Sequence, residues 1–201
     1  MAPLLDDSFS PFLIDAAGVR GALARLDASY REVLSRHAYP PILQRLLGEL
    51  LAASVVLAGS LKFNGSLVLQ LQGDGVLRLL VVECNRELGL RAMAQWQGDV
   101  PETSELRALA GNGRFVITLD PKDGGELHQG IVPLEAGSVA ELLEQYLARS
   151  EQIASRFWLT AADGVAAGLM LQRMPDAVRD DADGWNRVSI LGQTVSPLEL
   201  R

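Results

Sequence analysis

Few side chains in this sequence could carry out chemistry. The chain of 201 residues has two histidines, His37 and His128, and one cysteine, Cys84. Nucleophilic catalysis needs a nucleophile, a base and an orienting group that lie close together, and these residues form no such set. We expect His37 to have a structural role near the end of a helix, where an imidazole favours the helix dipole. We expect His128 to lie on the surface of a strand.

The spacings that bind metals and nucleotides are also absent from the sequence. No group of cysteines and histidines has the paired spacing of a zinc site. Glycines at Gly111 and Gly113 follow a helical pattern, where glycine ends a helix far more often than it binds phosphate. Cys84 lies in an apolar strand without basic neighbours that would lower the pKa of its thiol. We therefore expect no catalytic residue, no metal and no cofactor in this chain.

Composition and charge exclude several classes of protein. The net charge of −7 disfavours nucleic-acid binding, because an acidic surface repels phosphate groups. Residues 46–61 are the most apolar stretch, but their uninterrupted part is shorter than the ~18 residues of a membrane span, so we expect a buried core helix. The N-terminus lacks the basic region of a signal peptide. With a single thiol, this indicates a cytoplasmic protein that contacts no membrane.

The hydrophobic pattern alternates between the periods of helices and strands. Capping-box patterns at Ser29 and Ser138 predict two helix starts, and Pro41 opens the long apolar helix. Strands are expected at residues 19–23, in a three-stranded meander over 66–97, in a hairpin over 113–134 and in two last strands over 155–174. A short helix is expected before Gly111. We predict an α+β fold in which an antiparallel β-sheet core is packed with helices.

The character of the chain changes at Pro175. The stretch "PDAVRDDADG", residues 175–184, is acidic and rich in helix breakers, which is typical of a linker. We therefore predict a core domain over residues 1–175 and a linker region with a short helical segment over 176–201. Ser196 and Pro197 form a helix-start signal close to the last residue.

The linker region carries apolar side chains that it cannot bury by itself. The residues concerned are Trp185, Val188, Ile190 and Leu191. An accessible apolar surface marks a site of interaction with other proteins. We therefore predict that these four residues bind client proteins or dock on the sheet of a partner subunit.

Several stretches in collinear order resemble one known family, the 33 kDa chaperonin or heat shock protein 33. The likeness extends over about residues 19–175. Its most specific parts are "LQLQGDG", "LAGNGRFVITL", "YLARSEQ" and "GLMLQRMP".

This resemblance implies a cytoplasmic, ATP-independent holdase that binds unfolding proteins during oxidative and heat stress. Members have an α+β core, a helical linker and a C-terminal module in which four cysteines bind zinc. Oxidation forms two disulfides, releases the zinc and exposes the client-binding surface. Members also form homodimers in which the linker can cross to the partner subunit.

The sequence departs from the family pattern in its cysteines. The four zinc ligands are absent, and Cys84 matches none of them. We therefore expect a truncated form, with the core, the first part of the linker and no zinc module. A redox switch is not expected in this chain, so client binding would be constitutive. Two alternatives remain open: a dimeric scaffold domain with one defined partner, and an enzyme with an irregular site near Asp74 or Glu151.

Overall fold

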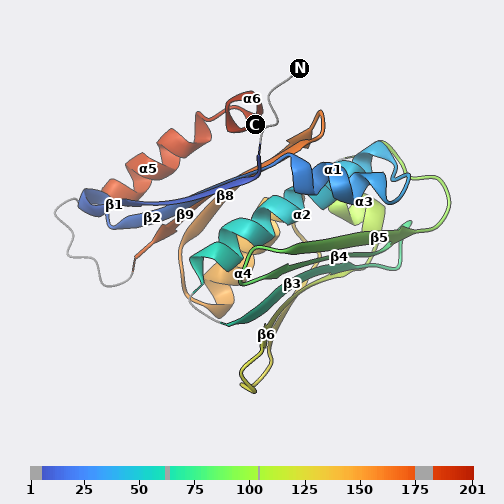
Figure 1. Cartoon of the computed structure of the whole chain (residues 1–201), viewed down its shortest axis with the longest axis horizontal. Coiled ribbons are helices and arrows are strands. Elements are labelled where there is room, and N and C mark those ends of the chain that lie inside the picture. Colours follow the sequence, from blue (N-terminus) through green and yellow to red (C-terminus); the bar gives the residue numbers. More distant parts are fainter. Residues whose placement is uncertain (1–5, 62–63, 104, 175–182) are drawn as a thin grey trace.

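The computed structural model describes residues 6–61, 64–103, 105–174 and 183–201. Two antiparallel sheets enclose a layer of helices (Figure 1). The terminal sheet takes strands from both ends of the chain, in the order β1 (Ser8–Ile14), β2 (Val19–Leu26), β9 (Val165–Arg173) and β8 (Ser155–Ala162). The central sheet has the order β5 (Leu90–Trp96), β4 (Leu77–Asn85), β3 (Gly65–Gln72), β6 (Arg114–Pro121) and β7 (His128–Pro133).

The helices occupy two places relative to these sheets. The 3-10 turn η1 (Asp15–Ala17) joins β1 to β2, and helices α1 (Ala28–Ser35), α2 (Pro41–Ser60), α3 (Leu106–Ala110) and α4 (Val139–Ser150) lie between or beside the sheets (Figure 1). Helices α5 (Gly184–Gln193) and α6 (Pro197–Leu200) lie on the outer side of the terminal sheet. The predicted α+β fold with antiparallel sheets is confirmed.

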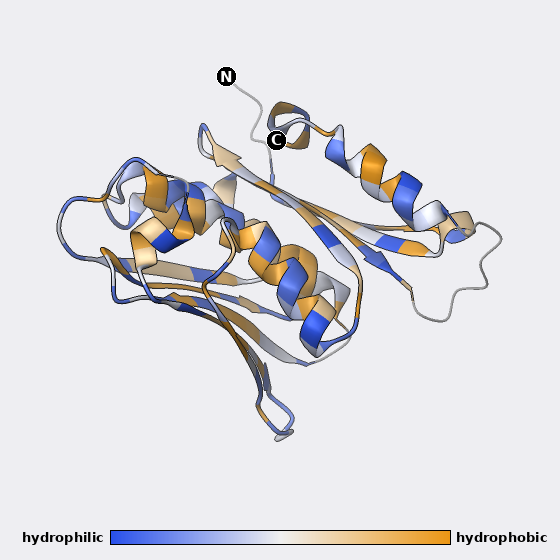
Figure 2. Ribbon diagram, turned by 180° about the vertical axis from the view of Figure 1, so that it is seen from behind, coloured by the Kyte–Doolittle hydropathy of each residue, from blue (hydrophilic) through white to orange (hydrophobic). Residues whose placement is uncertain are grey.

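Helix α2 is the centre of the hydrophobic core. It is apolar nearly all round and passes between the sheets (Figure 2), as a helix without a polar face must. Leu47, Leu50 and Leu51 have no exposed surface. Within the described residues, α2 is the one helix long and apolar enough to cross a membrane, and 72% of its apolar window is buried inside the protein. The predicted core helix is confirmed.

Small side chains allow α2 to lie close to the terminal sheet. A Cβ atom added at Gly48 would lie 2.4 Å from the Cβ atom of Ala161 in β8. On the other side, the alternating residues Leu67, Leu69 and Leu71 of β3 are buried. The predicted meander of β3, β4 and β5 is confirmed, and the same core extends into both sheets.

Strand β1 was not expected from the sequence. In the part of the chain that the structure describes, it pairs with β2 alone, so it is an edge strand, where Pro11 breaks no ladder between two neighbours. The ring of Phe9 fills the space above Gly59 of α2. Pairing and this contact stabilise a segment whose proline and serines argue against a strand.

The helix starts differ in part from the predicted capping boxes. Helix α1 begins after Asp27, so Ser29 lies within its first turn and does not cap it. A carboxylate from outside the helix takes that role: Asp7 accepts hydrogen bonds from the backbone N–H of Asp27 at 2.7 Å and of Ser29 at 3.1 Å. At α4, Ser138 caps as predicted, but Glu141 accepts from the N–H of Gly137 instead of closing the box on Ser138.

Candidate functional site

Helix α5 covers part of the outer face of the terminal sheet (Figure 1). Its sheet-facing residues recur at the spacing of one helical stripe: Trp185 and Val188 are half-buried, and Ser189 and Gly192 are buried. Trp185 and Val188 pack against Ala17, Val19 and Leu171, together with Ile14, Trp158 and Leu169. We call these eight residues the satellite cluster, because they form an apolar group separate from the main core.

The contact between α5 and the sheet is close at one point. A Cβ atom at Gly192 would lie 2.4 Å from Cη2 of Trp158 in β8. Any side chain at this position would therefore push the helix away from the indole ring. The sequence shows this glycine but not its partner, because the two residues are brought together only by the docking of α5.

One polar group weakens the docking of α5. The side chain of Ser189 is buried, and its hydroxyl has no hydrogen-bond partner among the described residues. Leaving a buried polar group unpaired costs about 1–3 kcal/mol. The apolar contacts of Trp185 and Val188 are therefore partly offset.

Helix α6 fastens the end of the described chain to the same sheet. Ser196 and Glu199 form a complete capping box, with hydrogen bonds in both directions, as the helix-start signal indicated. Hydrogen bonds from Ser196 hold the pKa of Glu199 below its usual value. Leu200 is buried, and the Arg201 guanidinium lies 2.8 Å from the carboxylate of Asp163. Arg25 donates to the Arg201 carbonyl oxygen.

The structure divides the four predicted linker residues into two pairs. Trp185 and Val188 lie against the sheet of their own chain, whereas Ile190 and Leu191 are 60% and 64% exposed. Leu198 on α6 is also exposed. Residues 175–182 of the predicted linker lie outside the described residues.

Sequence reasoning missed the apolar part of the sheet beside α5. Phe12 and Leu23 lie directly opposite Gly21 and Leu169, on the face that carries the satellite cluster, and each is 39% exposed. Period-two alternation in β2 places Val19 and Leu23 on one face. Because strand β1 was not predicted, the position of Phe12 beside these residues could not be recognised. Together with Ile190, Leu191 and Leu198, these two residues form what we call the outer apolar surface.

The residues considered for chemistry are held in structural roles. Burial raises the pKa of the Cys84 thiol to about 12, so the thiol stays protonated and is a poor nucleophile. His37 lies just beyond α1 and packs against Tyr39 and Trp96, with ring centroids 5.1 and 5.4 Å away. His128 is exposed at the start of β7. No cluster of three metal-binding side chains occurs in the described part of the chain.

The loop residues considered for an irregular site also make local hydrogen bonds. The Asp74 carboxylate accepts from the backbone N–H of Asn112 at 2.8 Å, beyond Gly111, which ends α3 as predicted. The Glu151 carboxylate accepts from the hydroxyl of Tyr146 at 3.1 Å, at the end of α4. The segment Arg149 to Gln152 therefore finishes a helix.

A family model and several known proteins are similar to this chain over most of its length. The family model described as Hsp33 protein matches residues 7–201. A 33 kDa chaperonin of Methylobacillus flagellatus is 49% identical over 198 residues, covering 98% of this chain and 67% of the relative. One of Chromobacterium violaceum is 49% identical, covering 96% and 66%. This chain therefore spans about two thirds of the length of these relatives.

A solved structure supports the fold. The crystal structure of the 33 kDa chaperonin of Thermotoga maritima superposes with a TM-score of 0.78 at 23% sequence identity, covering 96% of this chain and 72% of that one. The match of the family model to nearly the whole sequence, joined with the close relatives, shows that this chain belongs to the Hsp33 family.

Proposed function

We propose that this chain is an ATP-independent chaperone, a holdase that binds unfolding proteins and keeps them from aggregating. Membership of the Hsp33 family supports this proposal, because the relatives are named chaperonins. The client-binding surface in this proposal is the outer apolar surface, together with the sheet residues of the satellite cluster that α5 covers. Binding there needs no reactive group, since burial of apolar area is itself favourable and unselective.

The single observation that carries the proposal is the partial docking of α5. The helix buries one apolar stripe, leaves Ile190 and Leu191 exposed and encloses an unpaired hydroxyl at Ser189. The satellite cluster is separate from the main core. Helix α5 can therefore leave the sheet and uncover Trp158, Val19 and Leu171 without disturbing the packing around α2.

We also propose that the protein is cytoplasmic and that oxidation does not regulate client binding by this chain. The family resemblance implies zinc bound through cysteines, but this chain has only Cys84, and that thiol is buried. We propose unfolded clients and a second copy of the chain as partners. Docking of α5 on a partner's sheet in place of its own would form a dimer with exchanged linkers.

Light scattering by a thermally unfolding enzyme tests the proposal. The full chain should suppress aggregation of several unrelated clients without ATP, and to the same extent before and after peroxide treatment. A scaffold domain with one defined partner would leave unrelated clients to aggregate, which would refute the holdase. Sedimentation tests the exchange: a strict monomer at all concentrations would exclude it.

A further inference from the structure

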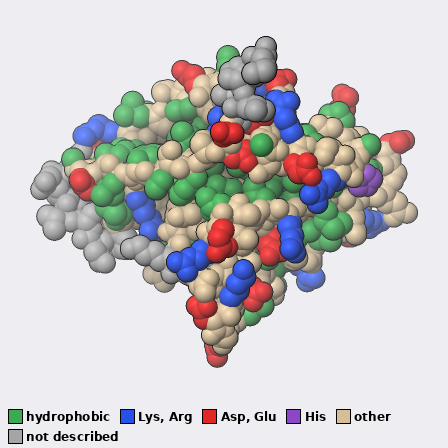
Figure 3. Space-filling model, viewed as in Figure 1, with side chains coloured by type: hydrophobic (Ala, Val, Ile, Leu, Met, Phe, Trp, Pro, Cys, Tyr) green, Lys and Arg blue, Asp and Glu red, His purple; other side chains and the backbone are tan. Residues whose placement is uncertain are grey.

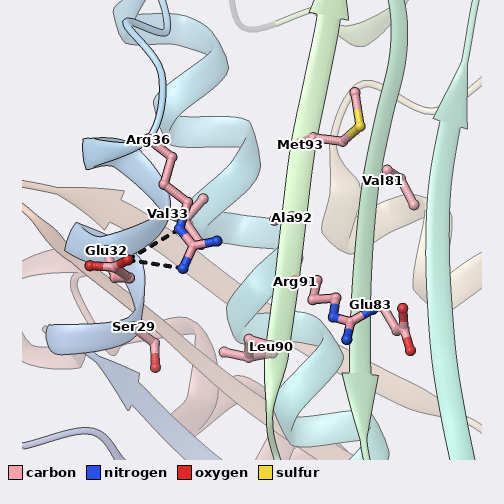
Figure 4. A pocket seen from close by; sticks show the side chains of 10 residues that line it. All are labelled: Ser29, Glu32, Val33, Arg36, Val81, Glu83, Leu90, Arg91, Ala92 and Met93. Atoms are coloured by element: carbon pink, nitrogen blue, oxygen red, sulfur yellow. Dashed lines mark hydrogen bonds and ion pairs between the residues drawn. The ribbon is translucent and has the colours of Figure 1, made fainter.

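A groove of about 480 Å³ runs between helix α1 and strand β5 (Figure 4). Among the described residues, strand β5 pairs only with β4, so it is an edge of the central sheet. Side chains from α1 form one wall, and the strands form the other. The lining of the groove includes Glu32, Val33 and Arg36 of α1 and Leu90, Ala92 and Met93 of β5.

The hydrogen bonds of the turn before β5 determine which backbone groups face the groove. The Asn85 N–H donates to the Gly89 carbonyl at 3.1 Å, and the Leu88 N–H donates to the Asn85 carbonyl at 3.0 Å. Asn85 and Gly89 are thus a hydrogen-bonded pair. Because such pairs alternate along an antiparallel ladder, the N–H and C=O groups of Leu90, Ala92 and Ala94 point away from β4.

These outward backbone groups have no hydrogen-bond partner within the described residues. No hydrogen bond in the described part of the chain joins the backbone of Leu90, Ala92 or Ala94 to α1 or to a side chain. Unpaired groups at alternate residues are the pattern that an added strand completes.

Each edge of the terminal sheet has one outward position at which the backbone N–H is bonded or missing. At β8, the Phe157 N–H donates to the Glu144 carboxylate of α4 at 2.9 Å. At β1, Pro11 has no N–H to donate. These are the devices by which proteins protect sheet edges, and β5 has neither a proline nor a hydrogen-bonded carboxylate on its outward groups.

The α1 wall can adapt to an occupant. Val33 offers a buried apolar contact, whereas Glu32 and Arg36 form an ion pair at 2.9 Å with side chains 63% and 73% exposed (Figure 4). Such surface pairs contribute about 0–1 kcal/mol. Their side chains can therefore turn aside or pair with charges on a bound segment at little cost.

We propose that this groove binds an extended segment of an unfolded polypeptide, which adds to β5 as a further strand. Alternate side chains of the segment would face Val33 on one side and Met93 on the other. The inference rests on the proposed holdase function and gives it a second binding surface. This surface would bind clients through their backbone N–H and C=O groups, so that binding does not depend on the client's sequence. A second copy of this chain, paired through its own β5, is the alternative occupant, and amide exchange at rising protein concentration distinguishes it.

Amide hydrogen exchange tests the proposal with a soluble peptide of alternating threonine and valine between terminal lysines. Addition of the peptide should slow exchange at Leu90, Ala92 and Ala94, and not at Arg91 or Met93, whose N–H groups are already paired with β4. The same peptide with methylated nitrogens at alternate residues should give no protection. Equal protection by both peptides, or none by either, would overturn the proposal.

A proline variant tests the same site from the protein. Ala92→Pro removes an outward N–H without breaking the β4 ladder, as an edge strand permits, and Ala92→Ser keeps it. The proline variant should bind the peptide about tenfold more weakly, which corresponds to about 1.4 kcal/mol, because one hydrogen bond is lost and the ring blocks the neighbouring position. The serine variant should bind like the parent. If the proline variant does not fold, the methylated peptide still decides.

The remaining outcomes are also decisive. Protection that rises with protein concentration in the absence of peptide means that a second copy fills the groove, which overturns the proposal. Suppression of client aggregation without any peptide protection refutes the β5 site and leaves the holdase standing. If the chain suppresses no aggregation at all, the proposed function itself fails, whatever the exchange data show.

Discussion

The carboxyl group of Glu49, a residue of α2, is largely buried. Burial raises its pKa from 4.5 to about 7, and Arg45 lowers it in part, with the guanidinium Nε 3.6 Å from the carboxylate. That nitrogen has no hydrogen-bond partner in the described residues, so the pair is loosely made. The protonated form of Glu49 is therefore favoured in the folded protein over the unfolded chain.

We predict that Glu49 makes the protein less stable as the pH rises. Because the pKa is raised on folding, its stabilising contribution is complete below pH 4.5 and is lost as the pH passes 7. The loss is on the order of 3 kcal/mol. Glu49→Gln should flatten the dependence of the free energy of unfolding on pH between 5 and 8, measured by urea denaturation. Glu32→Gln, at an exposed site, should leave the slope unchanged.

Cys84 should be unreactive in the folded protein. It is fully buried, and its pKa of about 12 leaves almost no thiolate at neutral pH. An aromatic disulfide reagent should label it only as fast as the protein unfolds, and immediately in denaturant. Rapid labelling of the native chain would show that β4 opens locally and would undermine the expectation that peroxide leaves client binding unaltered.

At the scale of elements, the docking of α5 can be changed in either direction. Trp185→Ala removes apolar contact with the satellite cluster and should loosen the helix, whereas Ser189→Ala removes an unpaired hydroxyl and should tighten it by about 1 kcal/mol. Amide exchange in α5 should speed up in the first variant and slow down in the second. Client binding should follow exchange, since both report uncovering of the sheet.

Ile190→Ala is the matched control for these variants. The side chain is on the same helix but is 60% exposed. It should leave amide exchange in α5 unaltered and weaken client binding. Identical exchange rates for Trp185→Ala and Ile190→Ala would mean that the satellite cluster does not hold the helix.

Sequence patterns predicted most elements because local periodicity is strong where one face is buried. Leu67, Leu69 and Leu71 alternate in β3, and α2 is too apolar to lie anywhere but inside. Strand β1 could not be predicted, because its stability comes from pairing with β2 and not from its own residues. The cap of α1 could not be predicted either, because its acceptor, Asp7, precedes Asp27 by 20 residues in the sequence.

The candidate site was predictable only in part. The sequence showed that the four linker residues are apolar and that the linker cannot bury them by itself. Their division into docked and exposed pairs depends on which face of α5 contacts Trp158. Phe12 and Leu23 became part of the surface through the pairing of β1 with β2. Long-range pairing of this kind leaves no trace in a local pattern.

At the scale of the whole molecule, charged groups of both signs surround hydrophobic side chains that reach the surface along the middle of one face (Figure 3). The main core runs through both sheets without interruption. The sheets are therefore expected to unfold together, while the satellite cluster can separate first.

The three tryptophans allow this order to be measured. Trp96 lies in the central sheet, Trp158 in the terminal sheet and Trp185 in α5. In variants that keep one tryptophan and replace the others by phenylalanine, Trp185 should report an early urea midpoint and Trp96 a later one. Trp158 contacts α5, so its fluorescence should change at both, with its second midpoint equal to that of Trp96. Separate midpoints for the two sheets would contradict a shared core.

The terminal sheet joins the two ends of the chain, with Ala22 of β2 opposite Met170 of β9. During synthesis, α2 leaves the ribosome long before β8 and β9, the strands that cover it, have been translated. The apolar helix α2 is then exposed to the cell, where nascent segments of this kind aggregate. Each nascent copy of the chain therefore needs protection from aggregation until β8 and β9 have been synthesised.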